Sequence, residues 1–269
     1  MGIVNVTPDS FFDGGHYTDA DEAVTHALEL VEQGADILDI GAESTRPGAT
    51  PVSEEEEVRR LLPVIEQLVP RVTVPISVDT MKSKVARRAL DAGASVINDV
   101  SALRFDPGMA QTIAQFGAGV VLMHMQGTPQ TMQQAPHYVD VVRDIKEFFV
   151  DRLRVATEAG IDESQIVLDP GFGFGKLFMH NLDILSHLSS FATLNRPLLV
   201  GLSRKGFIGR MLNRPVTHRE WGTAAAVALA VDRGAGIVRV HDVGMMADVV
   251  KVATALRASR PAIKQEHYA

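Results

Sequence analysis

Short apolar runs alternate with longer amphipathic stretches along most of the chain. The runs are rich in Val, Ile and Leu, and each closes on a polar residue, as in DILDIG, PISVDT and IVLD. About eight such runs occur, roughly 34 residues apart, which is the spacing of parallel strands that each lead into a helix. The pattern therefore predicts a series of repeated βα units.

The stretches between the runs carry the signals of helices with one apolar face. One stripe consists of Val24, Ala27, Leu28 and Val31. Ser53 followed by Glu56 predicts a capping box at the start of the next helix, in which Pro63 predicts a kink or an early end. Helix C-terminal caps are expected at Gly34, Gly93, Gly117, Gly160 and Gly234.

These units predict an α/β fold, a single parallel (β/α)₈ TIM barrel over residues 1–258 with a frayed tail at 259–269. A doubly wound open sheet uses the same alternation and is the competing architecture. The even spacing of the units favours the closed barrel. In such a barrel the active site lies at the carboxyl ends of the strands.

Composition narrows the partners. The chain has 269 residues and a net charge of −7, which argues against nucleic acid or an anionic membrane as the main partner and leaves small molecules. The absence of cysteine excludes disulfides and thiolate zinc sites. No apolar run reaches the roughly 20 residues that span a bilayer, and the first residues lack a signal-peptide pattern. We therefore expect a cytoplasmic protein.

Polar side chains gather where the predicted strands end, a placement that suits a ligand site better than a core. They are Asn5, Asp39, Asp79, Asn98, His124, Asp169, Ser203, Lys205, Arg239 and His241. Carboxylates and an amide can accept from the N–H groups of a heterocycle, and Lys205 can donate to its ring atoms. Arg239 and His241 suit a phosphate group.

The stretch IVLDPGFGFGK, from Ile166 to Lys176, places glycines directly after a strand. Its spacing matches neither a dinucleotide fingerprint nor a P-loop, and Leu177 stands where a P-loop needs a hydroxyl group. The glycines predict sharp bending or close approach of the backbone. We expect Lys176 itself to be a surface residue of a tight turn.

Three further features receive ordinary structural interpretations. His124 is expected to pack beneath a ligand rather than to bind a metal. The acidic run from Glu54 to Glu57 is expected to be a solvated helix start that the helix dipole favours. Trp221 and the Ala-rich stretch Ala224–Ala230 are expected to pack between helices.

Eight motifs in order give the chain a family resemblance. They are NVTPDSFFDGG, DIGAESTRPGA, SVDT, IND, LMHMQG, LDPGFGFGK, SRK and RVHDV, which span Gly2 to about Leu256. Together they resemble the dihydropteroate synthase family of folate biosynthesis, pterin-binding (β/α)₈ barrels. The resemblance implies a transferase in which p-aminobenzoate displaces pyrophosphate from 6-hydroxymethyl-7,8-dihydropterin pyrophosphate, giving 7,8-dihydropteroate.

The resemblance also implies roles for particular residues. The pterin pocket would consist of Asp79, Asn98, Asp169 and Lys205. The pyrophosphate site would consist of Asn5, Arg239 and His241, with Mg²⁺ held by Asn5. The p-aminobenzoate pocket would consist of Phe11, Thr45, Arg46, Pro47, Phe174 and Ser203. The catalytic residues would be Asp79, Lys205, Asp13 and Arg46.

Two alternatives stay open beside this interpretation. A methyltetrahydrofolate-binding methyltransferase barrel could use the same pterin-binding residues, and a pterin-binding paralogue could be catalytically silent. The family resemblance further implies a homodimer formed by the late helices and a p-aminobenzoate pocket that sulfonamides target. Phe12 departs from the family pattern, since a small polar residue is common there, and it could affect that pocket.

Overall fold

Parallel strands alternate with helices in the computed structural model, which describes residues 1–6, 16–45 and 48–260. The strands are β1 (Gly2–Asn5), β2 (Leu38–Gly41), β3 (Ile76–Asp79), β4 (Val96–Asp99), β5 (Gly119–Met123), β6 (Ile166–Asp169), β7 (Leu199–Val200) and β8 (Ile237–Val238). The helices are α1 (His16–Glu32), α2 (Glu54–Leu68), α3 (Ser83–Asp91), α4 (Met109–Phe116), α5 (Val141–Glu158), α6 (Phe178–Ser186), α7 (Gly206–Leu212), α8 (Glu220–Asp232) and α9 (Val243–Ala258). Short 3₁₀ segments are η2 (Glu163–Gln165), η3 (Leu188–Leu194) and η4 (Val216–His218).

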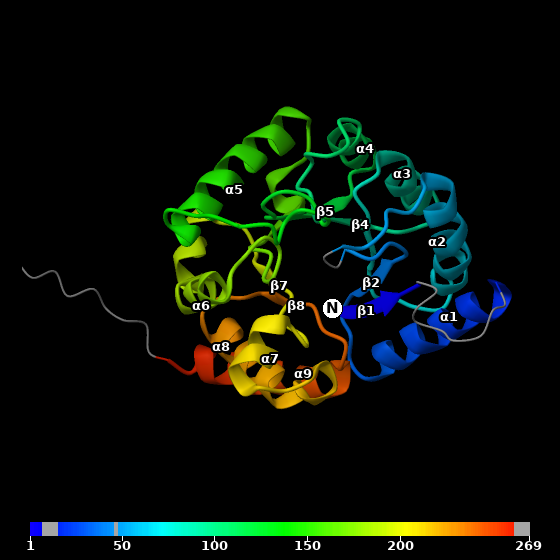
Figure 1. Ribbon diagram of the computed structural model, residues 1–269. Helices are drawn as coiled ribbons and strands as arrows, with labels where there is room; N and C mark the ends of the chain where they lie inside the picture. The colour runs from blue at the N-terminus through cyan, green and yellow to red at the C-terminus, as the bar shows by residue number, and fades with distance from the viewer. Residues whose placement is uncertain (7–15, 46–47, 261–269) are drawn as a thin grey trace, which may run out of the picture.

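Two isolated bridges close the strands into a barrel. Strands β1 to β6 pair in sequence order as one parallel sheet, and β7 pairs with β8. Leu168 bridges Leu198, which joins β6 to the start of β7, and Gly2 bridges Val240, which joins β1 to the end of β8. Figure 1 looks along the axis and shows the helices as a ring outside the strands. The predicted (β/α)₈ barrel is confirmed, and the open sheet is wrong.

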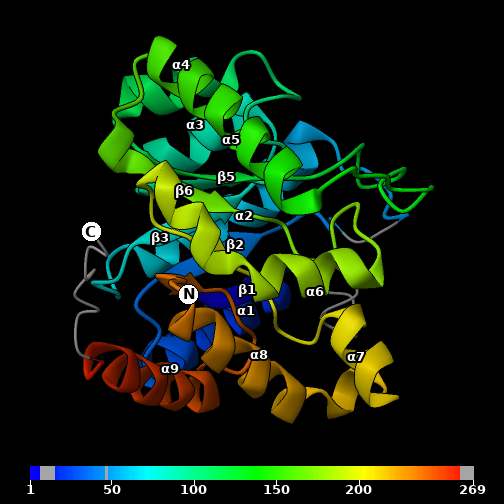
Figure 2. The ribbon, with the colours of Figure 1, turned by 90° about the vertical axis from the view of Figure 1, so that its left-hand side faces the viewer.

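Burial explains why the strands read as apolar runs rather than as alternating patterns. Every residue of β2 and of β3 is buried, because side chains fill the barrel interior and helices cover its outside. Figure 2, turned from Figure 1 by 90°, shows helices on both sides of the strands. One continuous apolar core runs from Val4 to Ala253 between the strands and the helices.

Helix α2 shows how far the local signals hold. Ser53 caps the helix, its Oγ accepting from the N–H of Glu56 at 3.2 Å, which is one half of the predicted capping box. The side chain of Glu56 pairs with Arg59 at 2.6 Å and with Arg60 at 2.7 Å. The helix continues through Pro63 to Leu68, so the predicted early end is wrong.

The glycines predicted as helix caps all have a left-handed backbone. Their φ angles lie between +59° and +107° at Gly34, Gly93, Gly117, Gly160 and Gly234. A side chain is strained in this region, so glycine ends each of these turns without cost from a Cβ atom.

The expected exposure of Glu57 and the expected packing of Trp221 between helices are both wrong. Glu57, the last residue of the acidic run, has a fully buried side chain that pairs with Lys82 at 2.6 Å, so only part of the run is a solvated helix start. Trp221 is 77% exposed at the start of α8 and does not pack between helices of this chain. Ala226 and Ala230 of the same helix are buried, as the Ala-rich stretch predicts.

Candidate active site

The parallel strands bring most of the predicted site residues to one end of the barrel. Asn5, Asp79 and Asp169 are the last residues of β1, β3 and β6. Asn98 is next to last in β4, and the strand register sets it directly beside Asp79. The others follow β5, β7 or β8, namely His124, Ser203, Lys205, Arg239 and His241.

Asp39 lies inside β2 rather than at its end, and it supports the residues above it. Its side chain is fully buried, and one carboxylate oxygen accepts from Arg239 Nε at 2.6 Å and from Asn98 Nδ2 at 3.1 Å. The other oxygen accepts from Ser77 Oγ at 2.6 Å. Asp39 is therefore a positioning residue for the amide and the guanidinium group, not a member of the barrel mouth.

Arg239 faces carboxylates in this structure. Besides its bond to Asp39, its Nη2 donates to Asp79 Oδ2 at 3.2 Å. Burial raises the pKa of Asp79 to about 7, although Arg239 favours the charged form, and the charge of Asp39 raises it further. Asp79 consequently titrates near neutrality, and Arg239 is the cation that balances it.

Asp169 and Lys205 are a second charged pair at this end of the barrel, and each affects the pKa of the other. Burial raises the pKa of Asp169 to about 6, and a hydrogen bond of 2.7 Å from the N–H of Gly171 opposes this rise. Burial lowers the pKa of Lys205 to about 8, while the charges of Asp169 and Asp79 oppose that fall. Shifted acid and base groups that act on one another are typical of ligand sites.

The glycines after β6 allow two loops to pack closely. Gly171 has a φ of +69°, and a Cβ atom there would lie 2.0 Å from the carbonyl oxygen of His124. At Gly175, with a φ of +60°, it would lie 2.8 Å from the carbonyl oxygen of Gln126. Glycine is thus required at these two positions because the chain segments approach each other closely.

Lys176 is buried, so its predicted place on the surface is wrong. Its Nζ lies 3.0 Å from Nδ1 of His124, 3.2 Å from the carbonyl oxygen of His124 and 3.0 Å from that of Phe174. His124 is also buried and packs edge-on against Phe148, with ring centroids 4.7 Å apart, in agreement with its predicted packing role.

Phe174 is held against Lys205 by the loop that carries it. The ammonium group of Lys205 lies 4.5 Å from the centroid of the Phe174 ring, within the range of a cation–π contact. The neighbouring Gly173 is fixed at its N–H by Asn181 at 2.8 Å and at its carbonyl by Gln133 at 2.7 Å. The structure therefore brings together the aromatic ring and the lysine that the sequence assigns to adjoining pockets.

His241 and Ser203 are joined directly. Nδ1 of His241 lies 2.9 Å from Ser203 Oγ, which also accepts the backbone N–H of His241 at 3.3 Å. Burial lowers the pKa of His241 to about 4, and the charges of Arg204 and Arg239 add to this fall. Asn5 ends β1, the strand next to β8, and is half-buried there.

Four of the predicted site residues lie outside the described residues. They are Phe11, Asp13, Arg46 and Pro47. Phe12 lies outside them as well. Thr45 is described and is half-buried.

Sequence reasoning missed the supporting roles of Asp39 and Lys176. One signal was available for Asp39, because an acidic residue inside an apolar strand needs a buried partner. The alternation of residues could not name Arg239 as that partner, since Asp39 lies in β2 and Arg239 follows β8, 200 residues further along the chain.

No helix in the described part of the chain is long and apolar enough to cross a membrane. The chain matches the family described as "Pterin binding enzyme" over residues 1–241. It is 46% identical over 260 residues to dihydropteroate synthase of Escherichia coli K12, covering 97% of this chain and 92% of that protein.

Solved structures agree with this match. A dihydropteroate synthase of Xanthomonas albilineans with 4-aminobenzoic acid has a TM-score of 0.90 and 51% identity, covering 97% of this chain and 93% of that one. A dihydropteroate synthase of Yersinia pestis in a sulfonamide drug complex has a TM-score of 0.91 and 46% identity, covering 96% and 94%. The chain belongs to the pterin-binding enzyme family, within which it groups with the dihydropteroate synthases.

Proposed function

We propose that this chain joins p-aminobenzoate to 6-hydroxymethyl-7,8-dihydropterin pyrophosphate, releasing pyrophosphate and forming 7,8-dihydropteroate. The observation that carries the proposal is the cluster of polar side chains at the strand ends, where the buried carboxyl groups of Asp79 and Asp169 lie with Asn98 and Lys205. The Escherichia coli relative bears the name of this activity.

The pocket has the donors and acceptors that a pterin requires. The guanidine-like edge of the pterin carries N–H groups, which the carboxylates of Asp79 and Asp169 can accept. The Lys205 ammonium group can donate to a ring oxygen or nitrogen. The carboxyl groups of Asp79 and Asp169 are almost completely buried, so water cannot readily replace the hydrogen bonds that they would accept from the ligand.

The pyrophosphate end of the substrate fits the groups around β1 and β8. Arg239 and His241 can donate to phosphate oxygens, and Asn5 at the end of β1 offers a carboxamide oxygen. The described residues contain no cluster of three His, Asp or Glu side chains that could hold a metal ion. Mg²⁺ fits this site only in the way it often binds in phosphate enzymes, through one protein oxygen together with substrate oxygens and water.

Charge distribution indicates a dissociative displacement. Bound Mg²⁺ would neutralise negative charge on the departing pyrophosphate. The C–O bond to pyrophosphate breaks first, and the carboxylate of Asp79 stabilises the cationic character left on the pterin methylene. The p-aminobenzoate nitrogen then forms the new C–N bond and loses a proton. An aromatic amine is nucleophilic when neutral, so Lys205 and Asp79 act by charge and position rather than as a strong base.

The second substrate fits beside Lys205 and the Phe174 ring, which lie 4.5 Å apart. Ser203 and Thr45 are proposed to contribute to the wall of this pocket. Asp13 and Arg46 are proposed to close over the reacting centre, and Phe11 and Pro47 to flank the aniline ring. A sulfonamide shares the aniline end of p-aminobenzoate, so it should enter the same pocket.

We infer that two copies of the chain associate through α8 and α9. Large apolar side chains of these helices are exposed, with Trp221 at 77%, Val252 at 61% and Leu256 at 62%. Single exposed apolar residues are common, but several on neighbouring helices form the kind of patch that a partner covers. Trp221→Glu should shift a dimer to a monomer in light scattering, whereas Val150→Glu serves as a control at an apolar position of α5 that is 60% exposed.

Turnover separates this function from its two rivals. The purified protein should release pyrophosphate only when the pterin pyrophosphate, p-aminobenzoate and Mg²⁺ are all present. A methyltransferase would instead need a methyl donor and would leave pyrophosphate attached. A silent paralogue would bind the pterin and release nothing.

A further inference from the structure

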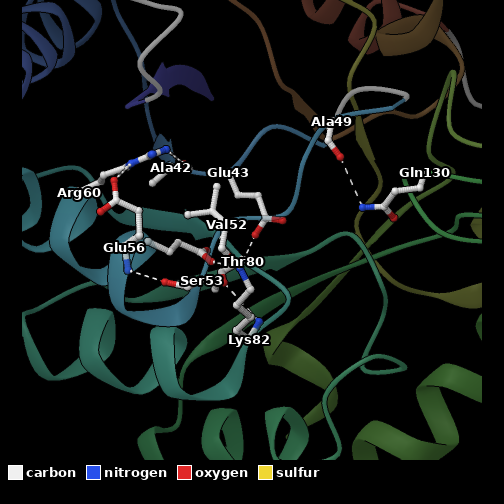
Figure 3. Close-up of polar contacts among 11 residues, drawn as sticks. Ala42, Glu43, Ala49, Val52, Ser53, Glu56, Arg60, Thr80, Lys82 and Gln130 are labelled. Carbon is white, nitrogen blue, oxygen red and sulfur yellow. Dashed lines mark hydrogen bonds and ion pairs between the residues drawn. The ribbon is translucent and has the colours of Figure 1, made fainter. Parts of the chain in front are cut away.

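Two carboxylates and a carbonyl group converge on the ammonium group of Lys82, outside the pterin pocket. Nζ of Lys82 forms an ion pair with Glu43 and donates to the carbonyl oxygen of Val52 at 2.7 Å (Figure 3). It also donates to Glu57 Oε2 at 2.6 Å. Lys82 stands three residues after Asp79 and directly before α3.

These contacts join both ends of one chain segment to Lys82, which directly precedes α3 in the neighbouring βα unit. Glu43 lies shortly after β2, and Val52 lies shortly before α2. The segment between them, residues 43–52, contains Thr45. A second contact, from Arg60 Nη1 to the carbonyl oxygen of Ala42 at 3.0 Å, holds the start of this segment (Figure 3).

Burial makes the Lys82 contacts costly to break. The side chain of Glu57 is fully buried, and those of Glu43 and Lys82 are 11% and 21% exposed. A buried charge whose partner is removed is strongly unfavourable, so the three groups hold one another in place. Burial disfavours the ammonium group, but the hydrogen bonds to Glu43 and Glu57 outweigh it and raise the pKa of Lys82.

We infer that Lys82 is a positioning residue for the p-aminobenzoate pocket, acting through Glu43 and Val52 on the segment that carries Thr45. The inference rests on the proposed function, because it assigns Thr45 to that pocket. Lys82 is not among the residues proposed to bind either substrate, and its effect is to set where both ends of residues 43–52 lie relative to Asp79 at the end of β3. Loosening these ends should weaken p-aminobenzoate binding and leave the deeper pterin pocket unchanged.

Glu43→Ala is the sharpest variant, because it frees one end of the segment and keeps the buried pair of Lys82 with Glu57. The Michaelis constant for p-aminobenzoate should rise about tenfold, and that for the pterin pyrophosphate should stay within about twofold. Lys82→Met should raise the Michaelis constant for p-aminobenzoate further. Lys84→Met is the matched control, because Lys84 lies in the first turn of α3, two residues after Lys82, but is 79% exposed and pairs with Glu54 at 2.9 Å.

Hydrogen exchange of the same proteins gives a readout that does not depend on turnover. Peptides covering residues 42–53 should exchange faster in Glu43→Ala and in Lys82→Met than in the parent, while peptides of β4 should not change. Unaltered exchange of residues 42–53 in both variants would overturn the inference, and so would a rise of both Michaelis constants together. A parent protein that releases no pyrophosphate would instead contradict the proposed function, and exchange would still decide what Lys82 holds.

Discussion

Lys176 and His124 join the loop after β6 to the end of β5, with 3.0 Å between Nζ and Nδ1. Burial lowers the pKa of Lys176 well below its ordinary value, against the attraction of Asp169. Burial also lowers the pKa of His124, and the charge of Lys176 adds to this fall. The imidazole is therefore neutral at pH 7 and hydrogen-bonds with Lys176, which also donates to two carbonyl groups.

Replacing Lys176 should lower the stability of the fold and weaken the p-aminobenzoate pocket. Lys176→Met keeps the length of the side chain but leaves the carbonyl oxygens of His124 and Phe174 without their buried donor. Each unsatisfied group costs about 1–3 kcal/mol, so the free energy of unfolding in urea should fall by that order. Lys84→Met, at an exposed position, should change it by less than about 1 kcal/mol. Equal stability of the two variants would show that the buried contacts contribute nothing.

The ion pair of Asp39 with Arg239 offers a second test, with Ser77 as its control. Asp39→Asn removes the charge that lies 2.6 Å from Arg239, and breaking a buried pair in this way costs about 3–5 kcal/mol. Ser77→Ala removes a single neutral partner of the same carboxylate and should cost about 1 kcal/mol. Asp39→Asn should also weaken pterin binding, because Asn98 and Arg239 lose their support. Calorimetric titration with the pterin pyrophosphate measures this effect, and unchanged affinity would contradict the positioning role.

The strand order and the barrel mouth could be predicted from the chain because parallel strands have a direction. Each apolar run that ends in a polar residue places that residue at the same end of the barrel, so Asp79, Asn98 and Asp169 follow from the pattern alone. The same logic failed for Asp39, which lies in mid-strand and faces a partner from β8.

The burial of charged side chains was harder to predict from the sequence than the position of the site residues at the strand ends. Glu57 lies in an acidic run and Lys176 follows a glycine-rich turn, two settings that suggest exposure to solvent, but packing against neighbouring segments buries both side chains. Their partners, His124 and Lys82, belong to other βα units, so the sequence around Lys176 or Glu57 does not predict these contacts. Exposure of Trp221 was missed for the opposite reason, since a large aromatic residue is more often buried within its own chain.

Pterin affinity should depend on the carboxyl group of Asp169. Asp169→Asn keeps the size of the side chain and loses a charge-assisted hydrogen bond to the pterin, which is worth about 1.5–3 kcal/mol. We expect a loss of affinity of roughly tenfold to over a hundredfold. Asp162→Asn, at an exposed turn in the same βα unit, serves as the control and should bind as the parent does. Tight binding by Asp169→Asn would remove this residue from the pocket.

Pterin binding should also strengthen as pH rises from 5.5 to 7.5. The pKa of Asp79 is raised from 3.8 to about 7 and that of Asp169 from 3.8 to about 6 in the folded protein. A raised pKa contributes stability that is fully present below the unfolded value and is lost as pH rises through the folded value. Ionised carboxylates thus destabilise the protein near pH 7.5, and a pterin that donates to them should restore that stability.

Two measurements test the predicted strengthening of pterin binding with rising pH. The rise in melting temperature caused by the pterin pyrophosphate should be larger at pH 7.5 than at pH 5.5. Binding at pH 6.5 should release protons, seen as a dependence of the calorimetric heat on the buffer's ionisation enthalpy. His241 has its pKa lowered from 6.5 to about 4, so its own contribution to stability is lost as pH falls through that range. Asp79→Asn isolates the carboxylate, because it should remove part of the pH dependence and leave the contribution of His241.

A sulfonamide should inhibit the protein by competing with p-aminobenzoate. The described part of the expected pocket contains Lys205 beside Phe174, which can hold an aniline ring by contact with the aromatic face and the lysine stem. The aniline nitrogen is the reacting group in both compounds, so the drug should also act as a slow alternative nucleophile and form a pterin–sulfonamide adduct that mass spectrometry detects. Phe174→Ala should weaken p-aminobenzoate and drug together, whereas the exposed Phe105→Ala, between β4 and α4, should affect neither. Inhibition that p-aminobenzoate cannot overcome would place the drug elsewhere, and full turnover in a large excess of drug would show that the pocket rejects it.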